Sequence, residues 1–530
     1  MRFGAMEQWG LVTYREYYLY YVPGRDNFLR QRQSTSIIGH ELIHQWFGNL
    51  VTCDWWDEIY INEAFGSIGG YLGMSMTGTD AFYQWEDEYL CSQTFSGMVT
   101  DSFNSSRPMV NRMNNDVTNA NYPVDSPSRI SAQFDNIGYN KAGSVMMMIR
   151  ALIGDRLWTQ ALHNYLTDRQ YQTGQWHHLL DHFDAVVNEN SDDPDLLNFD
   201  GRTIHQVFQP YFLQMGLPSL NINVYGKQLT IYTGRFLASE VKDKSWPKST
   251  LGYKWHIPLV VKENGTKQVI WLDEAGGPTF ATNTATDNFV LDPEANIWCR
   301  IQYSLNYIER LVTIPDQVKG ASVAKMMQDQ YRYLLSDYAE SEYGASIDNL
   351  LELTRLMVGK NDHTEWIMWR ELDTGNMFDM MDTIIVPYWI QNDESVLMDG
   401  YHSYMRSTFE QLFSSVYPDT PYDITKARAS PYAARLMLKY YDESNAEQLN
   451  RYYQTALLTV QNDVKFDEQS VDTRTFTFTG GVIAESYMES TTTLIDYLIG
   501  ELNSALESGT PVGDIIACCS KVTYHARFSL

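Results

Sequence analysis

The stretch His40-Glu41-Leu-Ile-His44, followed by Asn-Glu63-Ala-Phe, decides how this 530-residue chain folds and what it binds. Two histidines four residues apart point from one face of a helix, so both imidazoles can bind one metal ion. Catalytic zinc takes three protein ligands and leaves a fourth position to water, and Glu63 completes a set of two histidines and one glutamate. The alternative is a pair of structural histidines on a packed helix. We predict a zinc site of His40, His44 and Glu63, with Glu41 facing the open position.

The residues around the two histidines predict a pair of neighbouring helices. Between positions 34 and 50 apolar residues recur three and four apart, and Ser34 and Ser36 offer capping hydroxyls at the start. A break at positions 54–57 separates this segment from a second helical pattern that contains Glu63. The first helix is expected to be buried through Ile37, Ile38, Leu42, Ile43, Trp46 and Phe47.

Four segments together resemble the gluzincin aminopeptidases of the aminopeptidase N family. The run from His40 to Thr52 resembles the family's zinc motif, and Glu63 stands at the separation of its third ligand. Gly-Ala-Met-Glu7-Gln is similar to the exopeptidase motif Gly-Ala-Met-Glu-Asn. Residues 134–145 resemble the segment with the catalytic tyrosine, here Tyr139, and residues 213–218 resemble the exit from the catalytic domain.

The resemblance implies a role for each of these residues. Glu41 is the expected general base, because zinc lowers the pKa of bound water and a carboxylate can take its proton. Tyr139 is the expected donor to the tetrahedral oxyanion. Glu7 is expected to bind the substrate's free α-amine, with Ala5 and Met6 along the cleft.

Two positions depart from the family pattern. Gln8 replaces the usual asparagine and is one methylene longer, so we expect the geometry at the amine end to differ from that of relatives. Ala64 replaces the usual glycine after the third ligand, and helix tolerates that change.

A second histidine pair, His178 and His182, also has four-residue spacing. Leu179 occupies the place of the base, and the surrounding residues have the pattern of an amphipathic helix. A structural helix is therefore preferred there over a second metal site.

The chain predicts a multidomain α+β protein. Resemblance implies a thermolysin-like, mainly helical catalytic domain at 1–217 and an all-α C-terminal domain at 298–530. Between them, short alternating runs at 220–224, 229–232, 255–261, 269–272 and 289–291 predict a small β-sandwich at 218–297. Helical periodicity resumes in the segments 318–335, 347–357, 427–441 and 493–506.

Charge and short motifs restrict the partners. A formal net charge of −27 argues against a nucleic acid, because its phosphates would be repelled. There is no run of about eighteen apolar residues that could cross a membrane. Acceptor triplets at Asn104 and Asn264 favour an extracellular or cell-surface glycoprotein, while a cytoplasmic location and a homodimer stay open. The five cysteines are too scattered for a disulfide framework.

The resulting prediction is a zinc aminopeptidase that removes N-terminal residues from peptides with a free amine. Compared with the family pattern, the chain is expected to be a fragment that lacks an N-terminal domain, which in relatives carries any anchor, and the end of the helical domain. One alternative is an endopeptidase with the same zinc centre, against which Glu7 argues. The other is a catalytically silent receptor or binding protein on the same fold, which would need neither Glu41 nor Tyr139.

Overall fold

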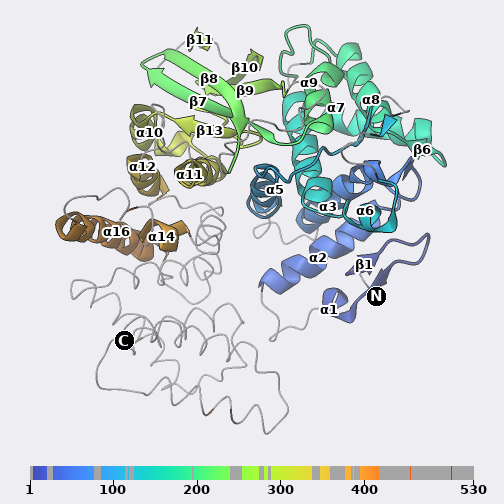
Figure 1. The fold of residues 1–530 in the computed structure, drawn as a ribbon, viewed down its shortest axis with the longest axis horizontal. Coiled ribbons are helices and arrows are strands. Elements are labelled where there is room, and N and C mark those ends of the chain that lie inside the picture. Colours follow the sequence, from blue (N-terminus) through green and yellow to red (C-terminus); the bar gives the residue numbers. More distant parts are fainter. Residues whose placement is uncertain are drawn as a thin grey trace. The chain divides into compact units, whose positions relative to one another are not determined.

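The computed structural model describes residues 4–20, 28–76, 85–113, 117–118, 124–193, 196–238, 253–273, 280–284, 288–336, 347–357, 377–382, 386 and 394–416, with the single positions 454, 500 and 503. Contacts divide the chain into two units (Figure 1). The first contains residues 1–15 and 35–356, and the second contains residues 16–34 and 357–530.

Helices form the part of the first unit that carries the predicted site. The helix α7 is almost entirely buried along its first three turns and packs against α3 and α8. Phe65 of α3 stacks on Phe47 at 4.0 Å between ring centroids, which joins the metal-binding segment to this core. The helical elements are α2 (Phe28–Ile43), α3 (Tyr60–Ser75), α4 (Trp85–Tyr89), α5 (Phe95–Asp101), α6 (Pro127–Ser131), α7 (Ala142–Arg169), α8 (Trp176–Glu189), α9 (Ile204–Leu213), the 3₁₀ turn η1 (Trp56–Glu58) and the π-helical turns η3 (Leu90–Thr94) and η4 (Ile137–Lys141).

The helix with the two histidines has other bounds than the sequence predicts. It runs from Phe28 to Ile43 instead of 34–50, and its residues 28–33 are good helix formers that extend it beyond the serines. It ends early because backbone bonds from Asn49 N to His44 O and from Leu50 N to Gln45 O curl the chain into a wider turn. The expected buried face is also partly wrong, since Leu42 is 52% exposed.

Small two-stranded pairings complete this region. The strands β1 (Ala5–Met6) and β2 (Thr13–Tyr14) form a hairpin at the start of the chain. The strands β3 (Thr52–Cys53) and β6 (Thr173–Gly174) pair in parallel, and β4 (Arg112–Met113) pairs with β5 (Val117–Thr118).

Two larger sheets follow α9 in the first unit. One has the strand order β11 (Phe280–Asn283), β8 (Gln228–Phe236), β7 (Leu217–Tyr225), β13 (Arg300–Tyr303), antiparallel except for the parallel pair β7 and β13. The other has the order β10 (Thr266–Asp273), β9 (His256–Glu263), β12 (Phe289–Leu291). All five segments that alternation predicts as strands are confirmed, and only residue 255, just before β9, falls outside them.

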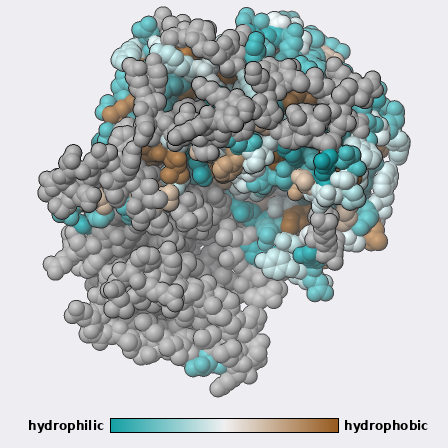
Figure 2. All heavy atoms as spheres, in the orientation of Figure 1, coloured by the Kyte–Doolittle hydropathy of each residue, from teal (hydrophilic) through white to brown (hydrophobic). Residues whose placement is uncertain are grey.

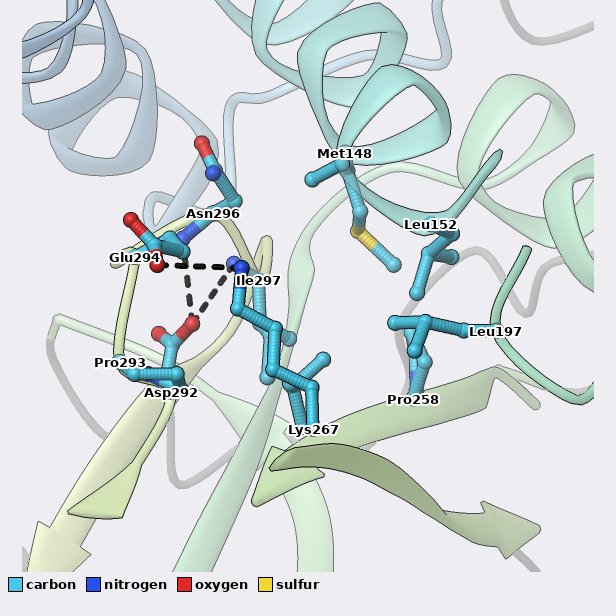
Figure 3. Close-up of a pocket in the computed structure, with 12 residues that line it drawn as sticks. Met148, Leu152, Leu197, Pro258, Lys267, Asp292, Pro293, Glu294, Asn296 and Ile297 are labelled. Atoms are coloured by element: carbon cyan, nitrogen blue, oxygen red, sulfur yellow. Dashed lines mark hydrogen bonds and ion pairs between the residues drawn. The ribbon is translucent and has the colours of Figure 1, made fainter. Parts of the chain in front are cut away.

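The junction between the helices and the sheets is an apolar crevice (Figure 3). Met148 and Leu152 of α7 face Pro258 of β9 across it. The sulfur of Met148 also accepts a hydrogen bond from Trp298 N at 3.4 Å. These contacts fix the start of α7, and therefore the turn η4 before it, against the sheets.

Helices return only after β13, a strand that lies beyond the predicted start of the helical region at 298. In the first unit they are α10 (Leu305–Val312), the 3₁₀ turn η5 (Pro315–Gln317), α11 (Gly320–Leu334) and α12 (Ile347–Met357), the last of which reaches the end of that unit. The second unit contains α1 (Glu16–Leu19), α14 (Met377–Met380) and α16 (Glu394–Val416). The predicted segments 318–335 and 347–357 are helices, whereas 427–441 and 493–506 fall outside the described residues apart from positions 500 and 503.

The coloured part of one face of the molecule is mainly hydrophilic (Figure 2). On the face drawn in Figure 2, hydrophilic residues cover most of the coloured area and hydrophobic ones are scattered over it. None of the described helices is long and apolar enough to cross a membrane.

Candidate metal centre

The two helices that carry the predicted ligands approach closely because α3 presents glycines to α2. A Cβ atom at Gly66 would lie 2.7 Å from the ring of His40, and one at Gly70 would lie 2.5 Å from Ser36 O. Real Cβ atoms do not come so near, so only glycine permits this spacing. The close packing brings Glu63 on α3 to the histidines of the α2 segment.

The three predicted ligands meet at one point. The Nε2 atoms of His40 and His44 are 2.9 Å apart, and Glu63 Oε2 lies 3.3 Å from the first and 3.5 Å from the second. Two ligands bound tetrahedrally at about 2.0–2.1 Å from zinc lie about 3.3 Å apart, so this triangle has the right size. Among the described residues, these three form the one group of acidic, histidine or cysteine side chains able to hold a metal ion.

His44 is oriented by the turn that ends α2. It is 1% exposed, and its Nδ1 lies 2.8 Å from Phe47 O, which leaves Nε2 to face the other ligands. A backbone carbonyl behind a ligating imidazole fixes the ring and its tautomer. Gly48 makes the turn possible, since its φ is +134°.

The electrostatics of the triangle suit a cation. Burial raises the pKa of Glu63, but the imidazoles of His40 and His44 outweigh this effect and lower it from 4.5 to about 2. Burial lowers the pKa of His44, and the contacts and charges of Glu63 and Glu7 overcome this and raise it to about 9. Two nitrogens and one ionised carboxylate are the donor set of a catalytic zinc site, so the residues fit the metal.

Glu41 lies beside the ligands without being one. It is 6% exposed, and its Oε2 atom is buried with no hydrogen-bond partner among the described residues. Burial raises the pKa of Glu41 from 4.5 to about 7, helped by the charges of Glu7 and Glu63 and opposed by that of His44. A carboxylate with a pKa near neutrality is suited to general base catalysis.

Tyr139 projects from the π-helical turn η4 towards the same point. Its ring is stacked on that of His40 at 6.1 Å between centroids. Burial, the charge of Glu63 and a contact with that carboxylate raise the pKa of the phenol. The hydroxyl therefore stays protonated and able to donate.

The hairpin with the predicted amine site is tied to the metal-binding segment. Glu7 O accepts hydrogen bonds from Gln45 Nε2 at 3.1 Å and from Asn49 Nδ2 at 2.6 Å. Ala5 is 7% exposed and Met6 is 37% exposed. Gln45 and Asn49 were not among the predicted site residues, although both lie in the run that resembles the family's zinc motif.

Gln8 does not extend along the site. Its exposed side-chain amide lies 2.9 Å from Met6 O and 3.1 Å from both Leu11 O and Thr13 Oγ1, and its nitrogen can donate to all three. The extra methylene thus lets the amide fold back and brace the hairpin.

Tyr14 is a further neighbour of the site that the sequence interpretation left without a role. Burial raises the pKa of Tyr14 to about 12, and the charge of Glu41 adds to the effect. Tyr14 pairs with Ala5 in the same hairpin as the segment that resembles the exopeptidase motif, seven residues after Glu7.

The second histidine pair is used structurally. His178 Nδ1 accepts from Gln175 N at 3.2 Å in a capping box, and His182 Nδ1 lies 2.7 Å from His178 O. These contacts support the amphipathic helix that the sequence favours.

Comparison with known proteins agrees with this geometry. Residues 1–211 match the peptidase family M1 domain. Glutamyl aminopeptidase of Bos taurus is 31% identical over 373 residues, which are 68% of this chain and 35% of that protein. Glutamyl aminopeptidase of Rattus norvegicus is 29% identical over 434 residues, 80% of this chain and 41% of that protein, and aminopeptidase N of the same species is 30% identical over 306 residues, 58% of this chain and 30% of that protein.

The chain thus spans less than half the length of these relatives, and the family match ends with α9, close to where the first of the two larger sheets begins. The matched residues include every member of the predicted metal centre, from Glu7 to Tyr139. With its metal-ligand triangle, its buried carboxylate and its matched sequence, the segment 1–211 belongs to peptidase family M1.

Proposed function

We propose that this protein is a zinc-dependent aminopeptidase that removes N-terminal residues from peptides with a free amine. The observation that carries the proposal is the triangle of His40, His44 and Glu63, which fits zinc, beside the partnerless carboxylate oxygen of Glu41. Relatives that are named glutamyl aminopeptidase and aminopeptidase N support the same activity.

His40, His44 and Glu63 would hold one zinc ion. When bound, zinc acidifies a water molecule and polarises the scissile carbonyl. Glu41 accepts the proton as water attacks and delivers it to the leaving amine. Its buried position and raised pKa support that role, because a group that titrates near neutrality can both take and return a proton.

Tyr139 donates a hydrogen bond to the oxyanion that forms on the attacked carbonyl. The protonated state of its phenol and its place against His40 support this assignment. A donor held in position before the reaction costs no reorganisation when the charge develops.

Glu7 binds the substrate's ammonium group and so sets the distance from the first residue to the attacked bond. Its negative charge raises the pKa values of Glu41, His44 and Tyr139, which supports a place for Glu7 at the same site. The hydrogen bonds from Gln45 and Asn49 hold its backbone, with Ala5 and Met6 in the strand before it.

The finer architecture is part of the proposal. We assign residues 1–217 to a thermolysin-like catalytic domain, 218–297 to a β-sandwich and 298–530 to a helical domain. The family match over 1–211 and the two sheets that follow it support the first boundary. An extracellular or cell-surface glycoprotein is the proposed location, supported by the exposed position of Asn264 in the turn between β9 and β10.

One experiment separates this function from its two rivals. The zinc-loaded chain is incubated with one peptide in free and N-acetylated form, and products are identified by mass spectrometry. We expect stepwise loss of N-terminal residues from the free peptide alone, because an acetylated amine cannot pair with Glu7. Equal cleavage of both forms would identify an endopeptidase, and cleavage of neither would favour a silent binding protein.

A further inference from the structure

The turn that presents Tyr139 has an unusual backbone. In η4 the chain closes a π-helical turn, with Lys141 N donating to Asn136 O at 2.9 Å. Such turns are rare and often lie at functional sites, and they persist only where surrounding contacts hold them. The contacts at both ends of η4 are therefore informative.

The end of the turn is anchored by a fully buried ion pair. Lys141 Nζ lies 2.9 Å from Asp101 Oδ2 and donates to Gln214 O at 3.0 Å and to Gly216 O at 3.2 Å. Asp101 is held in turn by Ser106 Oγ at 2.6 Å and by Gly216 N at 2.8 Å. Lys141 thereby fixes the last residue of η4 to α5 and to the segment that enters β7.

The start of the turn is anchored by a second ion pair. Asp135 Oδ1 accepts from Ile137 N and Gly138 N, each at 3.0 Å. Arg107 holds the same carboxylate through two bonds, at 2.7 and 3.1 Å, and also donates to Gln133 O at 2.9 Å. A bidentate arginine fixes both the position and the plane of a carboxylate.

Two glycines mark where neighbouring backbone packs closely against the turn. A Cβ atom at Gly138 would lie 2.5 Å from Gln133 O, and one at Gly97 of α5 would lie 3.0 Å from Lys141 N. Neighbouring backbone thus meets the turn directly, so the two ion pairs and the packing hold one arrangement.

We propose that Lys141 and Asp135 are positioning residues for Tyr139, which hold its π-helical turn from both ends so that the phenol reaches the oxyanion. This inference rests on the proposed function of Tyr139. The two residues act through that side chain, and their contribution is expected only while the phenol is present. Misplacing a catalytic group by about 1 Å can cost roughly 100-fold in rate.

The test is a pair of double-mutant cycles in the zinc-loaded chain. Lys141→Met and Asp135→Asn are each made alone and together with Tyr139→Phe, and kcat and KM are measured on one free dipeptide. We expect either single change to lower kcat by roughly 10- to 100-fold with KM within about threefold, and to have less than about a threefold effect once Tyr139 is phenylalanine. Asp135 is one-third exposed, so its variant provides the test if Lys141→Met does not fold.

Lys325→Met is the matched control. Lys325 is also buried, pairs with Asp329 at 2.8 Å and donates to the backbone carbonyl of Cys299 at 3.0 Å, but it belongs to α11. Its loss is expected to lower thermal stability without coupling to Tyr139→Phe. If Lys141→Met lowered kcat by the same factor with Tyr139 and with phenylalanine at that position, the positioning role would be overturned. If Tyr139→Phe alone left kcat unchanged, the proposed function of Tyr139 would be overturned, and this inference with it.

A binding measurement gives a readout that needs no turnover. A phosphinic analogue of leucyl-leucine carries a tetrahedral anionic group like the oxyanion, and free leucine does not. Calorimetry is expected to show that Lys141→Met raises the dissociation constant of the analogue by roughly 10-fold or more. The dissociation constant of leucine should rise by less than about threefold. Equal weakening of both ligands would mean a general structural defect and would contradict the proposal.

Discussion

Two clusters of buried charge in the first unit differ in how completely the protein pairs them. In the network between β13 and α11, Arg300 contacts Asp329 at 2.8 Å, and Lys325 lies 2.8 Å from Asp329 and 3.4 Å from Asp292. Two cations there face two anions. At the metal centre, by contrast, the carboxylates of Glu7, Glu41 and Glu63 are near only two imidazoles, those of His40 and His44, among the groups that shift the pKa values of Glu41 and Glu63.

The comparison separates a structural from a functional use of buried charge. Leaving a buried carboxylate underpaired costs free energy, so a fold retains it where another cation or a proton completes the site. In the network between β13 and α11, cations and anions are equal in number within the chain. We propose that zinc completes the metal centre, and the predictions below test this difference from the largest expected effect to the smallest.

Removing a ligand should abolish both metal binding and activity. In His44→Ala, one of the two nitrogen donors is lost, and we expect zinc content to fall from one per chain to nearly none and hydrolysis to become undetectable. Elemental analysis after dialysis measures the first and a dipeptide assay the second. His182→Ala is the control and should keep its zinc, so equal zinc in His44→Ala and the parent chain would refute the ligand assignment.

Removing the base should leave the metal in place. Glu41→Gln keeps the shape of the side chain, but an amide cannot accept a proton from water, so kcat should fall by roughly 100- to 10,000-fold with one zinc retained. Stopped-flow or endpoint assays together with elemental analysis measure both quantities. Turnover within threefold of the parent would show that Glu41 is not the base.

Breaking the paired network should affect stability instead of chemistry. Asp329→Ala leaves the buried charges of Arg300 and Lys325 without their shared partner, and we expect the free energy of unfolding to fall by about 3–5 kcal/mol. Denaturant unfolding of the chain measures it. Asp125→Ala, which removes an exposed pair with Arg129, is expected to cost less than about 0.5 kcal/mol. Similar losses in the two variants would erase the distinction between buried and exposed pairs.

The smallest effect concerns pH. Burial raises the pKa of Asp292 from 3.8 to about 6, with Lys325 opposing the shift and Asp329 adding to it. The folded chain therefore binds this proton more tightly than the unfolded chain, so the contribution of Asp292 to stability falls as pH rises from about 4 to about 6. The free energy of unfolding of Asp292→Asn, measured relative to that of the parent chain, should therefore increase by on the order of 1 kcal/mol between about pH 4 and about pH 6. If the difference in unfolding free energy between the variant and the parent chain stayed constant over this pH interval, the raised pKa of Asp292 would be contradicted.

Local patterns predicted the parts of the site that lie close together in the sequence. The ligand spacing in the first histidine segment depends on helix geometry alone, and Glu63 follows from the coordination number of zinc. Tyr139 and Glu7 required a resemblance to a family, because no periodicity marks a phenol or a carboxylate as functional. Five of the strands in the larger sheets were predicted because of their short-range hydrophobic pattern, whereas β11 was missed and β13, which is buried at every position, lay in the region expected to be helical.

What the sequence did not predict depends on contacts between distant segments. The hydrogen bonds from Gln45 and Asn49 to Glu7 O join positions about forty apart, and nothing in either segment indicates them. The bounds of α2 were wrong because capping hydroxyls were weighed above the helix preference of residues 28–33. The contacts of the Gln8 amide with its own hairpin were likewise not predicted, and its effect on the amine end stays a prediction.

The glycines that α3 presents to α2 have a consequence for how such a site is lost over generations. Gly66 and Gly70 carry no chemistry, yet a methyl group at the first would collide with the ring of His40 and one at the second with the backbone of α2. A descendant chain could keep all three donors and the whole recognisable motif and still lose its metal through one glycine codon. Inheritance of the metal centre therefore depends as much on atoms that are absent as on those that bind.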